Sequence, residues 1–98
     1  MKKIESSSFR HWVHGLRDEM ARIRIIARIN RLMEGLPGDV SAVGHGVSEL
    51  RVHHGPGYRL YFMQHGPDIV LLLAGGDKST QAQDIKTAIV IARALSQE

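Results

Sequence analysis

The chain contains no cysteine, which excludes disulfide bridges, thiolate zinc sites and cysteine nucleophiles and is typical of a reducing cytosol. Long apolar runs are also missing, because the longest one, residues 69–74, is far too short to span a bilayer. The start, MKKIESSSF, has two lysines but no apolar segment behind them, unlike a secretion signal. We therefore expect a soluble, cytoplasmic protein that is not exported and has no membrane partner.

Internal repeats, low-complexity segments and linkers are absent as well, so the 98 residues predict one domain spanning 1–98. With 43% hydrophobic residues the composition is that of a folded protein. Thirteen Lys and Arg outnumber ten Asp and Glu, and the formal charge of +3 attracts nucleic acid or an acidic partner. Many basic proteins of this size bind no nucleic acid, so the charge alone does not decide between these partners.

Patterns in the first 38 residues predict a short strand followed by a helical hairpin. Residues 2–5 can form the strand, and the serines at 6–8 can begin a first helix. Asp18 is a candidate N-cap for a second, longer helix that runs to about Glu34 and ends before Gly35 and Pro37.

The second helix has an apolar face and a basic face. We expect its core-facing stripe to consist of Met20, Ile23, Ile26, Ala27 and Met33, widened by Ile25, Ile29 and Leu32. Another face carries Arg17, Arg24, Arg28 and Arg31. These arginines can be an electrostatic footprint on RNA or an ordinary solvated helix face.

From residue 39 onward the hydrophobic period drops to two, which predicts antiparallel strands at 40–43, 47–53, 58–64 and 69–74 with glycine-rich turns between them. The last run is apolar on both sides, so we expect it to be covered on both faces of the sheet. A final helix should follow, opened by a capping box of Thr80 and Gln83. Its predicted buried stripe is Ile85, Ala88, Ile89, Ala92 and Leu95, which leaves Val90 and Ile91 exposed for a partner.

Two neighbouring strands place polar side chains on one sheet face. Because side chains alternate along a strand, Glu49, Arg51 and His53 point to the same side, and the next strand adds Arg59 and Tyr61. Arginines bind phosphate bidentately and stabilise the charge that develops on its oxygens, which predicts a phosphodiester site. The alternative is a solvated face on which Glu49 merely offsets an arginine.

Other candidate groups are histidines and one lysine. The six histidines lack good metal-binding spacing, so we predict no metal site, but His53, His54 or His65 can carry a proton. Lys78 directly follows a buried strand, where its side chain can reach over the sheet edge. The glycine-rich segments at 55–57 and 75–76 fit turns better than phosphate loops.

Three segments together resemble a known family: GVSELR at 46–51, GPGYRLYF at 55–62 and LLLAGGDKSTQ at 71–81. With DIKTA at 84–88 and the arginine-rich second helix, they resemble the RelE/HigB-like addiction-module killer family over nearly the whole chain. The resemblance implies an α+β, RelE-like fold, in which two N-terminal helices pack on an antiparallel sheet of four to five strands with a C-terminal helix. The elements predicted from the residues follow the same order.

The resemblance also implies an activity. Family members are typically cofactor-free and metal-independent endoribonucleases that cut mRNA, commonly on the ribosome, and a cognate antitoxin, often a helix-turn-helix protein, neutralises them. Carried over by position, the catalytic set is Arg51, Arg59, Lys78, His54 and Tyr61, with Arg59 as the phosphate-stabilising arginine. The RNA-binding set is Arg24, Arg28, Arg31, Glu49 and Tyr58.

One departure from the family concerns the proton donor. Several relatives carry a tyrosine or histidine near the C-terminus, and this chain has neither after His65. Candidates for the proton donor are Tyr58, Tyr61, His54 and Lys78. Two alternatives to a nuclease stay open at this point: a ParE-like toxin that inhibits DNA gyrase by binding, and a non-catalytic module that only binds a partner.

Overall fold

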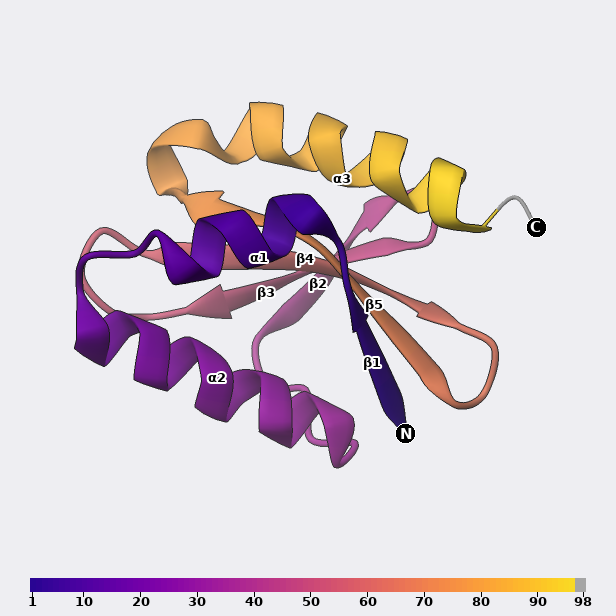
Figure 1. Cartoon of the computed structure of the whole chain (residues 1–98), viewed down its shortest axis with the longest axis horizontal. Coiled ribbons are helices and arrows are strands. Elements are labelled where there is room, and N and C mark those ends of the chain that lie inside the picture. Colours follow the sequence, from indigo (N-terminus) through magenta and orange to yellow (C-terminus); the bar gives the residue numbers. More distant parts are fainter. Residues whose placement is uncertain (97–98) are drawn as a thin grey trace.

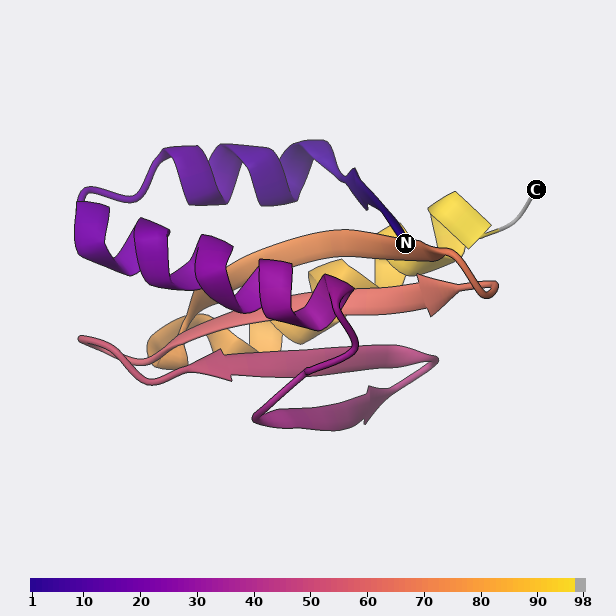
Figure 2. The same cartoon turned by 90° about the horizontal axis from the view of Figure 1, so that it is seen from below.

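The computed structural model describes residues 1–96 and places a five-stranded sheet between two helical layers (Figures 1 and 2). Helices α1 (Ser7–His14) and α2 (Glu19–Met33) cover one face, and α3 (Gln81–Ser96) covers the other. The strands are β1 (Lys2–Glu5), β2 (Val40–Gly44), β3 (Val47–Val52), β4 (Tyr58–His65) and β5 (Ile69–Asp77). The predicted α+β fold with two N-terminal helices and a C-terminal helix is confirmed.

The sheet has the strand order β1-β5-β4-β3-β2. Strands β2 to β5 form the expected antiparallel hairpins, whereas β1 pairs with β5 in parallel and makes the sheet mixed. The end of β1 is tied to β5 by the Ser6 hydroxyl, which donates to the Leu73 carbonyl at 2.6 Å. Strand β5 is covered on both faces, which explains its continuous apolar run.

Local side-chain chemistry starts each helix. The hydroxyl of Ser6 accepts from the Phe9 N–H, and the carboxylate of Asp18 accepts from the Ala21 N–H, which confirms both predicted helix starts. The predicted capping box of Thr80 and Gln83 is wrong. Residues Lys78–Thr80 form a 3-10 turn instead. Asp77 caps this turn, because its carboxylate accepts from the Ser79 N–H.

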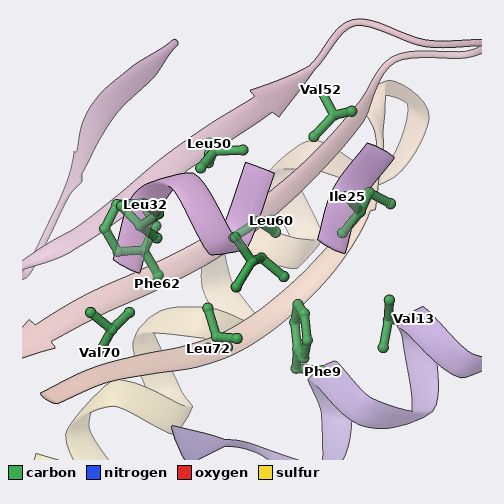
Figure 3. Packing of buried hydrophobic residues seen from close by; sticks show 11 residues of the cluster. Phe9, Val13, Ile25, Leu32, Leu50, Val52, Leu60, Phe62, Val70 and Leu72 are labelled. Carbon is green, nitrogen blue, oxygen red and sulfur yellow. The ribbon is translucent and has the colours of Figure 1, made fainter. Parts of the chain in front are cut away.

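The core-facing stripe predicted for α2 is wrong for Met20, Ile23, Ile26 and Ala27, but it is confirmed for Ile25, Ile29 and Leu32, and Met33 packs against the core. Its buried residues are Ala21, Ile25, Ile29 and Leu32. Ile25, Ile29 and Leu32 belong to the core cluster with side chains of the strands, and Figure 3 shows Ile25 and Leu32 in that cluster. Met20, Ile23 and Ile26 are instead 51%, 60% and 44% exposed. Apolar residues surround most of this helix, so the periodicity allows two stripes. The small Ala21, which has no exposed surface, is on the stripe that lies against the protein.

Helix α3 packs on the opposite face of the sheet through its alanines. Ala88 and Ala92 are buried in a cluster with Tyr61 and Leu73. Val90 is 66% exposed, as expected, but Ile91 is half-buried and Leu95, expected in the core, is 39% exposed. Small residues on the inner face let this helix lie close to the strands, which is why larger neighbours end up at the margin. None of the helices within residues 1–96 combines the length and the apolarity needed to cross a membrane.

Candidate functional site

The strand register brings the two predicted arginines together. Arg51 of β3 lies opposite Arg59 of β4, and Glu49 lies opposite Tyr61 on the same pair of strands. These side chains point to the sheet face that carries α3, so Glu49 is only 2% exposed and Tyr61 is fully buried. The alternative of a solvated sheet face is therefore wrong at these two positions.

Glu49 is the centre of this polar cluster. Its Oε1 accepts a hydrogen bond from Arg51 NH1 at 2.8 Å and lies 3.5 Å from Arg59 Nε. Its Oε2 accepts from the Tyr61 hydroxyl at 3.2 Å and from Gln81 Nε2 at 2.8 Å. Four polar neighbours thus compensate the burial of the carboxylate, and they join β3, β4 and the start of α3.

Tyr61 is held in its protonated form by this environment. Burial raises the pKa of its hydroxyl, and the negative charge of Glu49 raises it further. The hydroxyl donates to Glu49 rather than facing solvent. Tyr61 is therefore placed to support the carboxylate, away from any position a large substrate can reach.

Arg59 is the arginine of this cluster that lines a surface depression. Its Nε and NH1 atoms are buried and have no hydrogen-bond partner within residues 1–96, although its side chain is 15% exposed. The guanidinium lines a surface depression of about 470 Å³ together with His53, His54, residues 55–57 and Lys78. These two nitrogen atoms are closed to solvent, so an anion in the depression would meet the exposed part of the side chain, attracted by the positive charge of the guanidinium.

Arg51 differs from Arg59 because both of its terminal nitrogens are hydrogen-bonded. NH1 donates to Glu49, while NH2 donates to Asp39 at 2.8 Å and to Ser41 at 2.7 Å. Hydrogen bonds to Asp39 and Glu49 raise the pKa of this guanidinium. Arg51 thus fixes the orientation of Glu49 and holds the segment before β2, whereas Arg59 lines the depression.

Asp39 makes the stability of the fold depend on pH in the acid range. Hydrogen bonds from Arg51 and then from His53, whose Nε2 lies 2.6 Å from Oδ2, lower the pKa of this carboxyl from 3.8 to about 2. A depressed folded-state pKa stabilises the fold above pH 3.8, and this contribution is lost as the pH falls toward about 2.

We expect an NMR titration of the Asp39 carboxyl carbon to have its midpoint near pH 2. Urea unfolding of the wild type should show a loss of stability between about pH 4 and 2, and Asp39→Asn should flatten that part of the curve. A midpoint close to 3.8 would contradict the ion pairs described above.

The remaining predicted catalytic residues differ in position. His54 Nε2 lies 3.0 Å from Asp18 Oδ2 and fixes the turn between β3 and β4 to the start of α2. Lys78 is exposed on the 3-10 turn, on the rim of the depression. Tyr58 is half-buried with its ring 6.5 Å from that of Trp12, so it belongs to the core. The structure therefore groups Arg59, His54 and Lys78 around one depression.

The arginines of α2 adjoin this depression. Arg24 and Arg31 are exposed and line a second hollow of about 300 Å³, which shares His53 with the first. Arg28 lines it too, but its guanidinium donates to the carbonyls of Arg51 and Pro37. Arg24 and Arg31 are thus available to a ligand, and Arg28 mainly ties α2 to the sheet.

Sequence reasoning missed three members of the cluster: Asp39, Ser41 and Gln81. Each contacts Arg51 or Glu49 across at least ten residues of sequence. No local motif marks such contacts, although the strand pairing of Ser41 with Glu49 could have suggested one of them. Within residues 1–96, no group of three or more His, Asp or Glu side chains is placed to hold a metal ion.

Comparison with known proteins identifies the family. Residues 12–96 match the family described as phage derived protein Gp49-like (DUF891). An uncharacterized protein of Haemophilus influenzae strain Rd is 44% identical over 88 residues, which cover 90% of this chain and 89% of that protein. The match includes both helical layers, all the strands from β2 to β5 and the polar cluster. The chain therefore belongs to the Gp49-like family of phage-derived proteins, a toxin-like family of addiction modules.

Proposed function

We propose that the protein is the toxin of a toxin–antitoxin module and acts as a metal-independent mRNA endoribonuclease on the ribosome. A cognate antitoxin, a helix-turn-helix protein, holds it inactive. The observation that carries the proposal is Arg59, whose positively charged side chain lines a depression together with Lys78 and His54. Membership of a toxin-like family supports the same conclusion.

The proposed reaction is an internal transfer of the RNA phosphate. The ribose 2′-hydroxyl attacks the adjacent phosphorus and the bond to the 5′-oxygen breaks, which leaves a 2′,3′-cyclic phosphate and a 5′-hydroxyl. Arg59 donates hydrogen bonds to the phosphate oxygens as their negative charge grows, and Lys78 adds a second positive charge. His54 and Lys78, which line the depression, are the proposed proton carriers for the 2′-oxygen and the leaving oxygen.

The flanking RNA would follow the basic surface of α2. His53 lies at the junction of the two depressions, and Arg24 and Arg31 continue the positive charge beyond it. Such contacts bind phosphates without reading bases, so they contribute affinity that falls as salt rises. Sequence preference would then come from the ribosomal context or from stacking near the scissile bond.

The proposal is tested by the chemistry of new RNA ends. After induction of the wild-type protein, mRNA should acquire 5′-hydroxyl and 2′,3′-cyclic phosphate ends within minutes, and purified protein with ribosomes and mRNA should reproduce them without added metal. A supercoiling assay with purified gyrase is the matched measurement for the alternative. Growth arrest with gyrase inhibited and no new RNA ends would overturn the nuclease and favour a ParE-like inhibitor.

A further inference from the structure

Helix α2 carries a second apolar face, opposite to the one that packs on the sheet. Met20, Ile23, Ile26 and Ala27 form this outer stripe, and the three large side chains are between 44% and 60% exposed. The helix lies at the outside of its layer (Figure 2), and no other part of the described chain covers the stripe. A row of apolar residues three and four positions apart is the pattern by which one helix docks another.

The outer stripe has a basic border on both sides. Between Glu19 and Glu34, α2 contains four arginines and no acidic residue. Arg24 and Arg31 lie on one side of the stripe, exposed and without an ion pair inside residues 1–96. Arg22 lies on the other side, next to Lys3 of β1. A partner that covers the stripe therefore meets positive charge along both edges.

A hollow beside Ile26 adds shape to this surface. It has a volume of about 160 Å³ and an apolar lining that includes Phe9, Val13 and Ile29. The polar side chains that also line it are Lys3, Glu5, His14 and Arg22. The hollow lies between β1, α1 and α2, where it can receive an apolar side chain of a docked segment. The partner should therefore offer apolar side chains to the stripe and the hollow, and negative charge to the arginines of α2.

We propose that the outer stripe of α2 binds an acidic amphipathic helix of the antitoxin. The identity of the partner rests on the proposed function, whereas the chemistry of the partner rests on the side chains of α2. Because Arg24 and Arg31 border the stripe and also line the second depression, the bound helix covers part of the surface proposed to hold RNA. Binding at α2 would thus neutralise the toxin without entering the depression at Arg59.

Two synthetic helical peptides provide the probe. One has leucine at helical core spacing and glutamate elsewhere, and the other has lysine in place of every glutamate. We expect fluorescence anisotropy with the full chain to show that the glutamate peptide binds at least about tenfold more tightly, with an affinity that falls as salt rises. Ile23→Glu should weaken this binding by at least about tenfold, because it puts a charge at the centre of the stripe.

Val90→Glu is the matched control, since Val90 is 66% exposed on α3 and lies on the other side of the sheet. This variant should bind the glutamate peptide like the wild type. Equal binding of the two peptides, no binding of the glutamate peptide, or a greater loss in Val90→Glu than in Ile23→Glu would overturn the proposal. A wild-type dimer in sedimentation velocity that Ile23→Glu converts to monomer would also overturn it, because a second copy would then be the occupant.

The same variants separate this inference from the proposed function. Ile23 lies outside the proposed catalytic machinery, so Ile23→Glu should still produce new RNA ends at the wild-type rate when no peptide is present. Peptide binding without RNA cleavage would refute the nuclease and leave the docking surface standing. RNA cleavage without selective peptide binding would support the nuclease and refute the docking surface.

Discussion

Arg59→Ala should lower the rate of RNA cleavage by about 10²–10³-fold, which is the usual loss when one donor to a developing oxyanion is removed. The reason is that the Arg59 side chain lines the depression, whereas the terminal nitrogens of Arg51 are hydrogen-bonded to Glu49, Asp39 and Ser41. The fold should survive, since Glu49 keeps Arg51, Tyr61 and Gln81 as partners. The measurements are the rate of appearance of new RNA ends and the thermal unfolding midpoint.

Two further variants make the Arg59 result specific. Arg59→Lys keeps the positive charge but loses the planar fork, so its rate should lie between those of the wild type and Arg59→Ala. Arg93→Ala removes an equal charge from the exposed surface of α3 and should cleave RNA like the wild type. A folded Arg59→Ala variant with full activity would show that the phosphate is held elsewhere.

Glu49→Ala should cause the largest loss of stability, about 3–5 kcal/mol in the free energy of unfolding. The substitution leaves the Arg59 guanidinium without its counter-charge and removes the acceptor of the Tyr61 hydroxyl and the Gln81 amide. The loss is comparable to the total stability of many small domains, so partial unfolding at room temperature is expected. Urea unfolding followed by circular dichroism measures it.

A double variant distinguishes the stability lost to an unpaired buried charge from the stability lost to poorer packing. Replacing both Glu49 and Arg59 with apolar residues of similar volume should recover part of the stability, because no unpaired charge is then left inside. Glu49→Gln keeps an acceptor oxygen and should lose less than Glu49→Ala. Glu34→Ala, at the exposed end of α2, is the surface control and should change stability by less than about 0.5 kcal/mol. If Glu49→Ala matched that control, the cluster would not contribute to the fold.

The sequence predicted those features that depend on local chemistry. The starts of α1 and α2 follow from Ser6 and Asp18, and the pairing of Arg51 with Arg59 follows from strand alternation and a short turn. These features are set by neighbours within a few residues, or by a hairpin whose register the turn fixes.

Features that depend on distant contacts could not be predicted in the same way. Alternation placed Glu49 and Tyr61 on a polar face, but only the packing of α3 shows that this face is buried. In α2 the period admitted two apolar stripes, and the choice between them depends on how closely the helix approaches the sheet. The occupied donors of Arg51 likewise depend on Asp39, which lies in an irregular segment twelve residues earlier in sequence.

The parallel pairing of β1 with β5 also affects the order in which the chain can fold. β1 is synthesised first, but its hydrogen-bonding partner is more than sixty residues further along the chain. Closing so long a loop is slower than closing the hairpins of β2 to β5, so we expect the N-terminal strand to join the sheet after them. During translation this edge of the sheet therefore cannot form before β5 has been made.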